Sequence, residues 1–200
     1  MNDMENKTLD YYKQNADNFV KGTVDVDFKE TQDRFLKELC GRRVLDFGCG
    51  SGRDTKYFLE EGLDVVAIDG CEELCKIASE YTGIQVKHML FQELDEVNRY
   101  DGIWACSSIL HLSKDELKKV LLKMKDALSE NGIIYTSFKY GNFEGERNGR
   151  YFTDFTLELF NDFIKDIDGI EIKEYWMTGD VRVGREGEKW LNLILKRINF

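Results

Sequence analysis

The stretch Val44–Thr55, VLDFGCGSGRDT, decides the fold of this chain. Residues 43–47 form a short, largely apolar run typical of a buried strand, and residues 54–61 predict a helix that stops at Gly62. Three alternating glycines connect the two, and glycine allows the backbone to take positive φ and to approach a ligand closely. Because the loop opens onto a helix N-terminus, whose free N–H groups favour an anionic group, the sequence predicts a nucleotide-like ligand.

The spacing of the loop separates the nucleotide motifs from one another. The dinucleotide fingerprint G-x-G-x-x-G requires glycine at position 53, where this chain has Arg53. The phosphate-binding P-loop requires Gly-Lys followed by Ser or Thr, and this sequence is absent. The sequence therefore gives less support to a dinucleotide-binding loop and to a P-loop.

The glycine loop resembles the first motif of the class I S-adenosylmethionine-dependent methyltransferases, which here takes the form Asp-x-Gly-x-Gly-x-Gly. The resemblance extends from about Tyr11 to the last predicted strand, although only the glycine segment is specific. It implies S-adenosylmethionine as cofactor and S-adenosylhomocysteine as its product. The cofactor contacts expected in this motif are Asp46, Gly48, Cys49, Gly50, Gly52 and Arg53. Alternating glycines between a strand and a helix also occur as simple packing in α/β proteins, so that alternative stays open.

The composition predicts one cytoplasmic domain. At 200 residues and 42% hydrophobic, the chain is long enough to bury a full core, and no break in composition divides it. No apolar run approaches the roughly 18 residues of a membrane span, and the N-terminal residues lack the basic and apolar regions of a signal peptide. We therefore expect a single domain over residues 1–200, a cytoplasmic location and no membrane partner.

Charge, cysteines and prolines restrict the chemistry further. A net charge of −10 disfavours nucleic acid as a partner, because grip on a phosphate backbone depends on Lys and Arg. The five cysteines include no Cys-x-x-Cys pair and only two histidines accompany them, so we predict neither a disulfide framework nor a metal site. The chain has no proline. It therefore lacks the proline-containing motifs shared by methyltransferases of exocyclic base amines, of protein glutamine and of cytosine carbon 5, and Cys106 is expected to be a buried residue at a strand end.

Two helices, over residues 9–19 and 28–40, are predicted before the first strand, and residues 1–40 would form a helical cap. The first of them is similar to the YYxxNAxxY lead-in of small-molecule methyltransferases, in which a tyrosine reaches over the amino-acid end of the cofactor. The resemblance assigns this role to Tyr11 and Tyr12, and Tyr12 is also a catalytic candidate. The alternative is an amphipathic cap whose aromatic residues only pack.

An acid ends the second predicted strand, residues 63–69. At this position in a βαβ unit a carboxylate lies across the crevice from the glycine loop, where it can accept hydrogen bonds from ribose hydroxyls. Asp69 is therefore the second predicted anchor of the cofactor, with Gly70 beside it. Its alternative role is to cap the helix that starts near Cys71.

The third and fourth strands are predicted at residues 84–89 and 100–106. The resemblance implies that residues after the third strand frame the adenine, which assigns Phe91 and Gln92, with a surface loop as the alternative. Carboxyl ends of strands face the ligand crevice in a doubly wound sheet, so the residues after the fourth strand are expected near the reaction. These are Cys106 as a cofactor contact, Ser107 as a substrate contact, and His111 as a substrate contact or proton acceptor. A packed His111 with one backbone hydrogen bond is the alternative.

A capping box, Ser113 with Glu116, starts a helix that is expected to end at Asn131-Gly132, before a fifth strand over residues 133–138. Residues 139–153 then predict a polar lid loop that recognises the substrate. Its candidates are Lys139, Tyr140, Arg147, Arg150 and Tyr151. Solvated loop charges are the alternative for each of them.

A helix over residues 155–167 and two strands over 170–177 and 189–196 complete the chain, and their short connection makes the strands antiparallel. This ending resembles that of class I methyltransferases. We expect an α/β fold, a Rossmann-like, doubly wound, seven-stranded sheet in the order 3-2-1-4-5-7-6, with strand 7 antiparallel, in three α/β/α layers.

The predicted function is methyl transfer from S-adenosylmethionine to a small-molecule acceptor by in-line displacement. The segments YYxxNA, DFGCGSGRDT and FKYG to GRYF resemble the branch that contains the tellurite-resistance and related small-molecule methyltransferases. A tRNA or protein methyltransferase, and a non-catalytic or nicotinamide-binding Rossmann domain, are the alternatives. The acceptor and the oligomeric state stay open.

Overall fold

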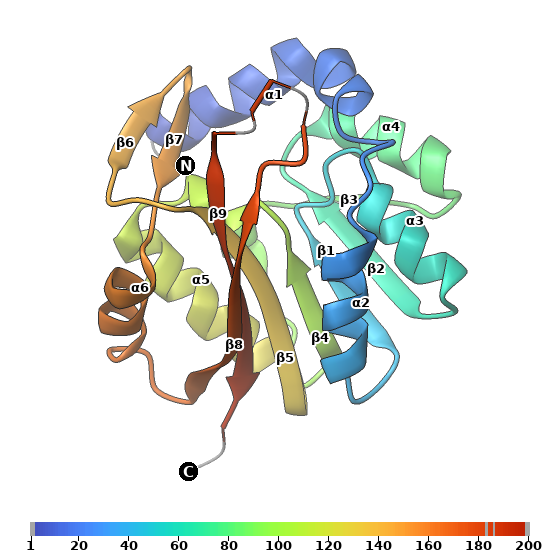
Figure 1. Cartoon of the computed structure of the whole chain (residues 1–200). Coiled ribbons are helices and arrows are strands. Elements are labelled where there is room, and N and C mark those ends of the chain that lie inside the picture. The colour runs from blue at the N-terminus through green and yellow to red at the C-terminus, as the bar shows by residue number, and fades with distance from the viewer. Residues whose placement is uncertain (1–2, 183, 186, 199–200) are drawn as a thin grey trace.

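A twisted sheet runs through the centre of the molecule (Figure 1). The computed structural model describes residues 3–182, 184–185 and 187–198. Within these residues the main sheet has seven strands in the order β3-β2-β1-β4-β5-β9-β8. They are β1 (Arg43–Phe47), β2 (Asp64–Asp69), β3 (Lys87–His88), β4 (Tyr100–Ala105), β5 (Leu128–Lys139), β8 (Ile170–Gly179) and β9 (Lys189–Arg197). Only β9 runs antiparallel to its neighbours, β5 and β8, so the predicted sheet order is confirmed.

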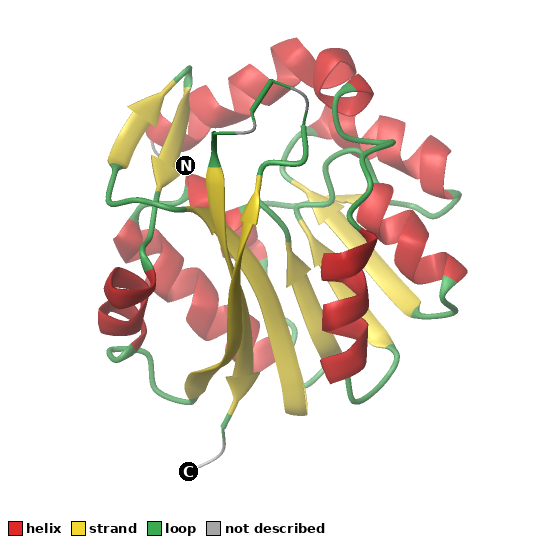
Figure 2. Cartoon of the chain, viewed as in Figure 1, coloured by secondary structure: helices red, strands yellow, loops and turns green. Residues whose placement is uncertain are grey.

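Helices cover both faces of this sheet (Figure 2). The bounds are α1 (Asp3–Lys21), α2 (Lys29–Glu38), α3 (Arg53–Glu60), α4 (Glu72–Thr82), α5 (Lys114–Ala127) and α6 (Leu157–Ile164), with short 3-10 helices η1 (Phe91–Glu93) and η2 (Ile109–His111). Side chains of α2 and α3 share one buried cluster, and side chains of α5 and α6 share another. The arrangement is the three-layer α/β/α fold expected from the sequence.

Alternation along the strands sends side chains to the two layers in turn. In β1, Leu45 and Phe47 face the α5 and α6 side, whereas Val44 faces α2 and α3. In β4, Trp104 lies on the α2 side, where its ring stacks on Tyr135 of β5 with centroids 4.0 Å apart. The central strands β1 and β4 are thus buried on both faces, as is typical of parallel sheets.

The boundary between α5 and β5 differs from the prediction. Ser113 and Glu116 do form the capping box that starts α5. The helix ends at Ala127, however, and not at Asn131-Gly132, because Leu128 already has an extended backbone and pairs with Tyr100 of β4. The register of the pair shifts after Tyr100, so the residues before Ile133 join the strand as an irregular segment.

The predicted lid loop contains a β-hairpin. Strands β6 (Glu144–Arg147) and β7 (Arg150–Thr153) pair antiparallel in a separate small sheet, joined by Asn148 and Gly149 with φ of 53° and 75°. Positive φ at both central residues defines a type I′ turn, for which Asn-Gly is the favoured sequence. Residues 139–153 are therefore an ordered arm and not an irregular loop.

Helix α1 is longer than the predicted helix over residues 9–19, and it lies across the edge of the sheet where β1, β2 and β4 end (Figure 1). Its Ala16 packs with Cys71 and Leu74 at the start of α4. The helix therefore covers the glycine loop. None of the helices in the described part of the chain is both long and apolar enough to cross a membrane.

Candidate cofactor and acceptor site

A cavity opens at the carboxyl ends of the parallel strands, under α1. It is bordered by the glycine loop, by the segments after β2, β3 and β4, by β7, and by the connection between β8 and β9. The predicted site residues that line it are Tyr12, Gly48, Cys49, Gly50, Arg53, Asp69, Gly70, Phe91, Gln92, Cys106, Ser107, His111, Lys139 and Arg150. Most of the predicted cofactor contacts and four of the predicted substrate contacts therefore meet in one place.

The glycine loop is shaped so that its backbone forms one wall of the cavity. Gly48 and Gly50 have φ of 89° and 54°. A Cβ added at Gly50 would lie 2.9 Å from the ring of Phe19 on α1, and one added at Gly48 would lie 2.6 Å from the Cβ of Ser108. Glycine is required at both positions for the space as well as for the backbone angles. The two glycines therefore let Ser108 and Phe19 pack against the loop, whose backbone is left at the cavity wall.

Asp69, at the end of β2, ties the glycine loop to the next helix. Its Oδ2 accepts a hydrogen bond from the Gly50 N–H at 2.9 Å, and its Oδ1 accepts one from the Cys71 N–H at 2.8 Å. Each carboxylate oxygen has a second lone pair, so the group retains capacity for ribose hydroxyls at the cavity wall. Burial raises the pKa of Asp69, and these two N–H donors oppose the rise. The N-cap of α4 is Cys71, and no side chain of the described residues caps the helix, so Asp69 does not take the capping role.

Arg53, which replaces the last glycine of the dinucleotide fingerprint, is held in a buried network. Its Nε and Nη2 donate to the two oxygens of Asp54 at 2.8 and 2.9 Å. Asp54 also accepts from Gln32 at 2.7 Å and from Trp104 Nε1 at 2.8 Å. These donors hold the pKa of Asp54 below its usual range even though the carboxyl is buried. Sequence analysis did not identify Asp54 as a site residue, although it directly follows Arg53.

The residues expected around the cofactor divide between the cavity wall and its support. Phe91, in η1, lies at the wall and packs on Phe47 with ring centroids 4.7 Å apart. Asp46 lies beneath the loop, where its carboxyl accepts the Thr55 hydroxyl at 2.5 Å and where burial raises its pKa. A Cβ at Gly52 would meet Thr82 and Ala78 of α4, so this glycine allows two helices to approach.

Tyr12 and His111 form a partly buried hydrogen-bonded pair at the cavity wall. His111 Nδ1 lies 2.6 Å from the Tyr151 carbonyl oxygen, which can only accept, so Nδ1 carries the proton. The other nitrogen, Nε2, is then the acceptor for the Tyr12 hydroxyl at 2.8 Å. The backbone contact that defined the packed alternative is present, but the second nitrogen faces a cavity residue. A proton on Tyr12 therefore has an acceptor already in place.

Burial lowers the pKa of His111 to about 4, against 6.5 for a free histidine. Between these values the unfolded chain binds a proton that the folded protein does not, so stability is lost as the pH falls. From pH 7 to pH 5 this group is expected to remove roughly 2 kcal/mol of unfolding free energy. Urea unfolding at both pH values should show that loss in the wild type and not in His111→Gln. Equal losses in the two proteins would contradict the buried, neutral state of His111.

Several predicted residues lie outside the cavity wall. Tyr11, Tyr140, Arg147 and Tyr151 do not line it, although Tyr151 supplies the carbonyl to His111 and Arg147 packs on the Phe152 ring. Conversely, the connection between β8 and β9 contributes Asp180, Arg182 and Arg185, which sequence analysis did not assign to the site. Their position follows from strand direction: β9 is antiparallel to β5, so the turn that precedes β9 lies at the carboxyl edge of the parallel strands.

Comparisons with known proteins agree with this geometry. Residues 44–132 match the profile of the Methyltransferase domain family. An uncharacterised methyltransferase of Bacillus cytotoxicus is 28% identical over 137 residues, which is 64% of this chain and 64% of the relative. The match therefore spans less than two thirds of that relative's length.

Two solved structures share the fold over most of the chain. The 1,6-didemethyltoxoflavin-N1-methyltransferase of Burkholderia thailandensis, with bound 1,6-didemethyltoxoflavin and S-adenosylhomocysteine, has a TM-score of 0.75 at 21% identity, covering 96% of this chain and 85% of its own. The magnesium protoporphyrin IX methyltransferase of Synechocystis, with bound S-adenosylmethionine, has a TM-score of 0.71 at 17% identity and covers 99% of both chains.

This chain carries the fold and the first motif of the class I S-adenosylmethionine-dependent methyltransferases. The family resemblance seen in the glycine loop is confirmed by the matches in sequence and in fold. The compounds bound in these two solved neighbours are S-adenosylhomocysteine and S-adenosylmethionine. None of these matches singles out the tellurite-resistance branch.

Proposed function

We propose that this protein transfers the methyl group of S-adenosylmethionine to a small-molecule acceptor. The observation that carries the proposal is the closure of the cavity on several sides. Helix α1, strand β7 and the connection between β8 and β9 line it together with the glycine loop. An acceptor has to lie within these walls to reach a cofactor held by Gly50 and Asp69, which favours a small molecule over tRNA or a folded protein.

The chain's residues divide between holding the cofactor and receiving a proton. Gly48, Gly50, Asp69 and Phe91 would hold the adenosyl part. When bound, the cofactor supplies an electrophilic sulfonium methyl group, so the acceptor forms a bond to the methyl carbon while the electron pair of the carbon–sulfur bond stays on sulfur. The chain has mainly to align the acceptor and exclude water.

An acceptor that carries a hydroxyl, amine or thiol proton has to lose it during the transfer. We propose that the Tyr12 oxygen takes this proton while the Tyr12 hydroxyl proton moves to His111 Nε2, 2.8 Å away. Arg150 Nη1, which donates to the same oxygen at 3.3 Å, favours negative charge on it.

The cytoplasmic location of the reaction stays a prediction.

A transfer assay with methyl-labelled S-adenosylmethionine tests the proposed function. The purified protein is incubated with a metabolite extract passed through a membrane that retains macromolecules, with bulk tRNA, and with total protein. Label is expected in the metabolite fraction only. Incorporation into tRNA or protein, with none into metabolites, would contradict a small acceptor.

Tyr12→Phe is expected to slow transfer into metabolites about tenfold, because it removes the oxygen that receives the proton. The affinity for S-adenosylhomocysteine, measured by calorimetry, should change less than threefold. A matching control is Tyr175→Phe, since Tyr175 lies on β8 and is 53% exposed. An unchanged rate in Tyr12→Phe would remove Tyr12 from the reaction.

A further inference from the structure

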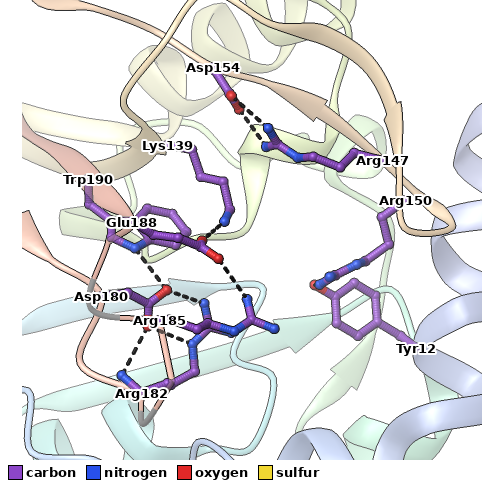
Figure 3. Close-up of polar contacts among 10 residues, drawn as sticks. All are labelled: Tyr12, Lys139, Arg147, Arg150, Asp154, Asp180, Arg182, Arg185, Glu188 and Trp190. Carbon is purple, nitrogen blue, oxygen red and sulfur yellow. Dashed lines mark hydrogen bonds and ion pairs between the residues drawn. The ribbon is translucent and has the colours of Figure 1, made fainter.

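Positive side chains gather on one side of the cavity, where the acceptor would lie. Lys139 ends β5, Arg150 begins β7, and Arg182 and Arg185 come from the connection between β8 and β9. These four residues, called here the cationic wall, converge from three separate segments on one space (Figure 3). The convergence stands out in a chain whose net charge is −10.

Neighbouring acids neutralise only part of this charge. Arg182 pairs with Asp180, with Nη2 at 2.5 Å and Nε at 2.9 Å from its oxygens. Lys139 and Arg185 both pair with Glu188, the latter at 3.8 Å (Figure 3). Two carboxylates thus pair with three of the four cations of the wall. A fifth cation nearby, Arg147, uses its own partner, Asp154, in two bonds of 3.0 Å.

Arg150 has no carboxylate partner among the described residues. Its Nη1 donates to the Tyr12 hydroxyl oxygen at 3.3 Å (Figure 3). Its guanidinium carbon lies 4.3 Å from the centroid of the Tyr11 ring. Its Nε is buried and has no hydrogen-bond partner within the described part of the chain. Buried donors in folded proteins are nearly always paired, so this guanidinium is prepared for an acceptor that comes from outside the chain.

The pKa of Lys139 reflects the same excess of positive charge. Its side chain is 15% exposed and lies against the rings of Phe152 and Trp190. Burial, together with the charges of Arg147, Arg185 and Arg182, lowers its pKa to about 8. An anion placed in the wall would relieve this repulsion.

We propose that the methyl acceptor carries an anionic oxygen group, a carboxylate or a phosphate, which Arg150 binds with Lys139 and Arg182 beside it. The planar guanidinium matches such groups in geometry and in charge. This inference rests on the proposed function, and it narrows the acceptor from any small molecule to an organic anion. Binding at Arg150 would also bring the acceptor next to the Tyr12 hydroxyl, the group proposed to receive its proton.

Calorimetry on protein saturated with S-adenosylhomocysteine tests the inference with three probes: 4-hydroxybenzoate, phenyl phosphate and the neutral 4-hydroxybenzamide. At least one of the two anions is expected to bind ten times more tightly than the amide, and the stronger of them identifies the group as carboxylate or phosphate. No preference for either anion over the amide, including no binding by any probe, would overturn the inference.

Variants test whether the cationic wall causes the preference for an anion over the neutral amide. Arg150→Gln should abolish it, and Arg150→Lys should retain part of it because the charge remains. The control Arg99→Gln removes an exposed arginine elsewhere on the protein and should leave the preference unchanged. A preference that survives Arg150→Gln would overturn the role of Arg150.

The affinity for S-adenosylhomocysteine is measured first, because it separates the two proposals. If the wild type does not bind it, the proposed function fails. If the wild type binds it but Arg150→Gln loses that affinity more than tenfold, Arg150 serves the carboxylate of the cofactor and the inference about the acceptor is overturned, while the proposed function survives.

Discussion

Asp69→Ala is expected to weaken the binding of S-adenosylhomocysteine at least 100-fold, which corresponds to about 2.7 kcal/mol. The substitution removes the acceptor of the Gly50 N–H at 2.9 Å and of the Cys71 N–H at 2.8 Å. It therefore frees the glycine loop from the end of β2 and also removes the proposed ribose contact. Hydrogen bonds to a charged group contribute about 1.5–3 kcal/mol each, so the two losses together account for the predicted effect. Isothermal titration calorimetry measures it directly.

Two further variants make this result interpretable. Asp69→Asn keeps the shape and one acceptor oxygen, so an intermediate loss is expected. Asp64→Ala removes an exposed acid from the opposite end of the same strand and should leave the affinity unchanged. If Asp69→Ala bound S-adenosylhomocysteine within threefold of the wild type, the placement of the ribose would be wrong.

Trp104→Ala is expected to lower the free energy of unfolding by about 3–5 kcal/mol, a large part of the total stability of a domain. The side chain is fully buried, stacks on Tyr135, and packs edge-on against Phe35 and Phe58 of α2 and α3. Truncation leaves a cavity between the sheet and both helices. Urea unfolding followed by circular dichroism measures the loss.

The same substitution also reaches the site, because Trp104 Nε1 donates to Asp54 at 2.8 Å and Asp54 holds Arg53. Trp104→Phe keeps most of the ring but removes this donor, so it should lose less stability than the alanine variant. The exposed aromatic Tyr175 provides the comparison, and Tyr175→Ala should change the unfolding free energy by less than about 0.5 kcal/mol. A loss below 1 kcal/mol in Trp104→Ala would contradict the packing described for this layer.

The fold was predictable because its decisive signals are local. The apolar runs, the glycine loop and the short connection before β9 each carry their meaning within a few residues, and the order of the sheet came from the family resemblance that these segments carry. The Asn148-Gly149 turn carries an equally local signal for a hairpin, but the polar composition around it was interpreted as a loop. The length of α5 was overestimated because the pairing of Leu128 with Tyr100, a tertiary contact, ends the helix before its local stop signal.

The site was predictable only where a motif defines it. Asp69 and the glycines stand at fixed positions relative to a strand end, so their neighbourhood could be inferred. The hydrogen bond between Tyr12 and His111 joins residues 99 positions apart, and no spacing in the sequence indicates it. The arginines after β8 enter the cavity because an antiparallel ending returns its turn to the ligand edge, a consequence of topology that the sequence analysis did not draw.

The most direct test of the account is a crystal structure of the protein with S-adenosylhomocysteine. We predict the ribose hydroxyls on Asp69, the adenine beside Phe91, and the sulfur directed toward the space between Tyr12 and the cationic wall. A ligand bound elsewhere, or bound in the cavity with its sulfur directed away from Tyr12, would contradict the account.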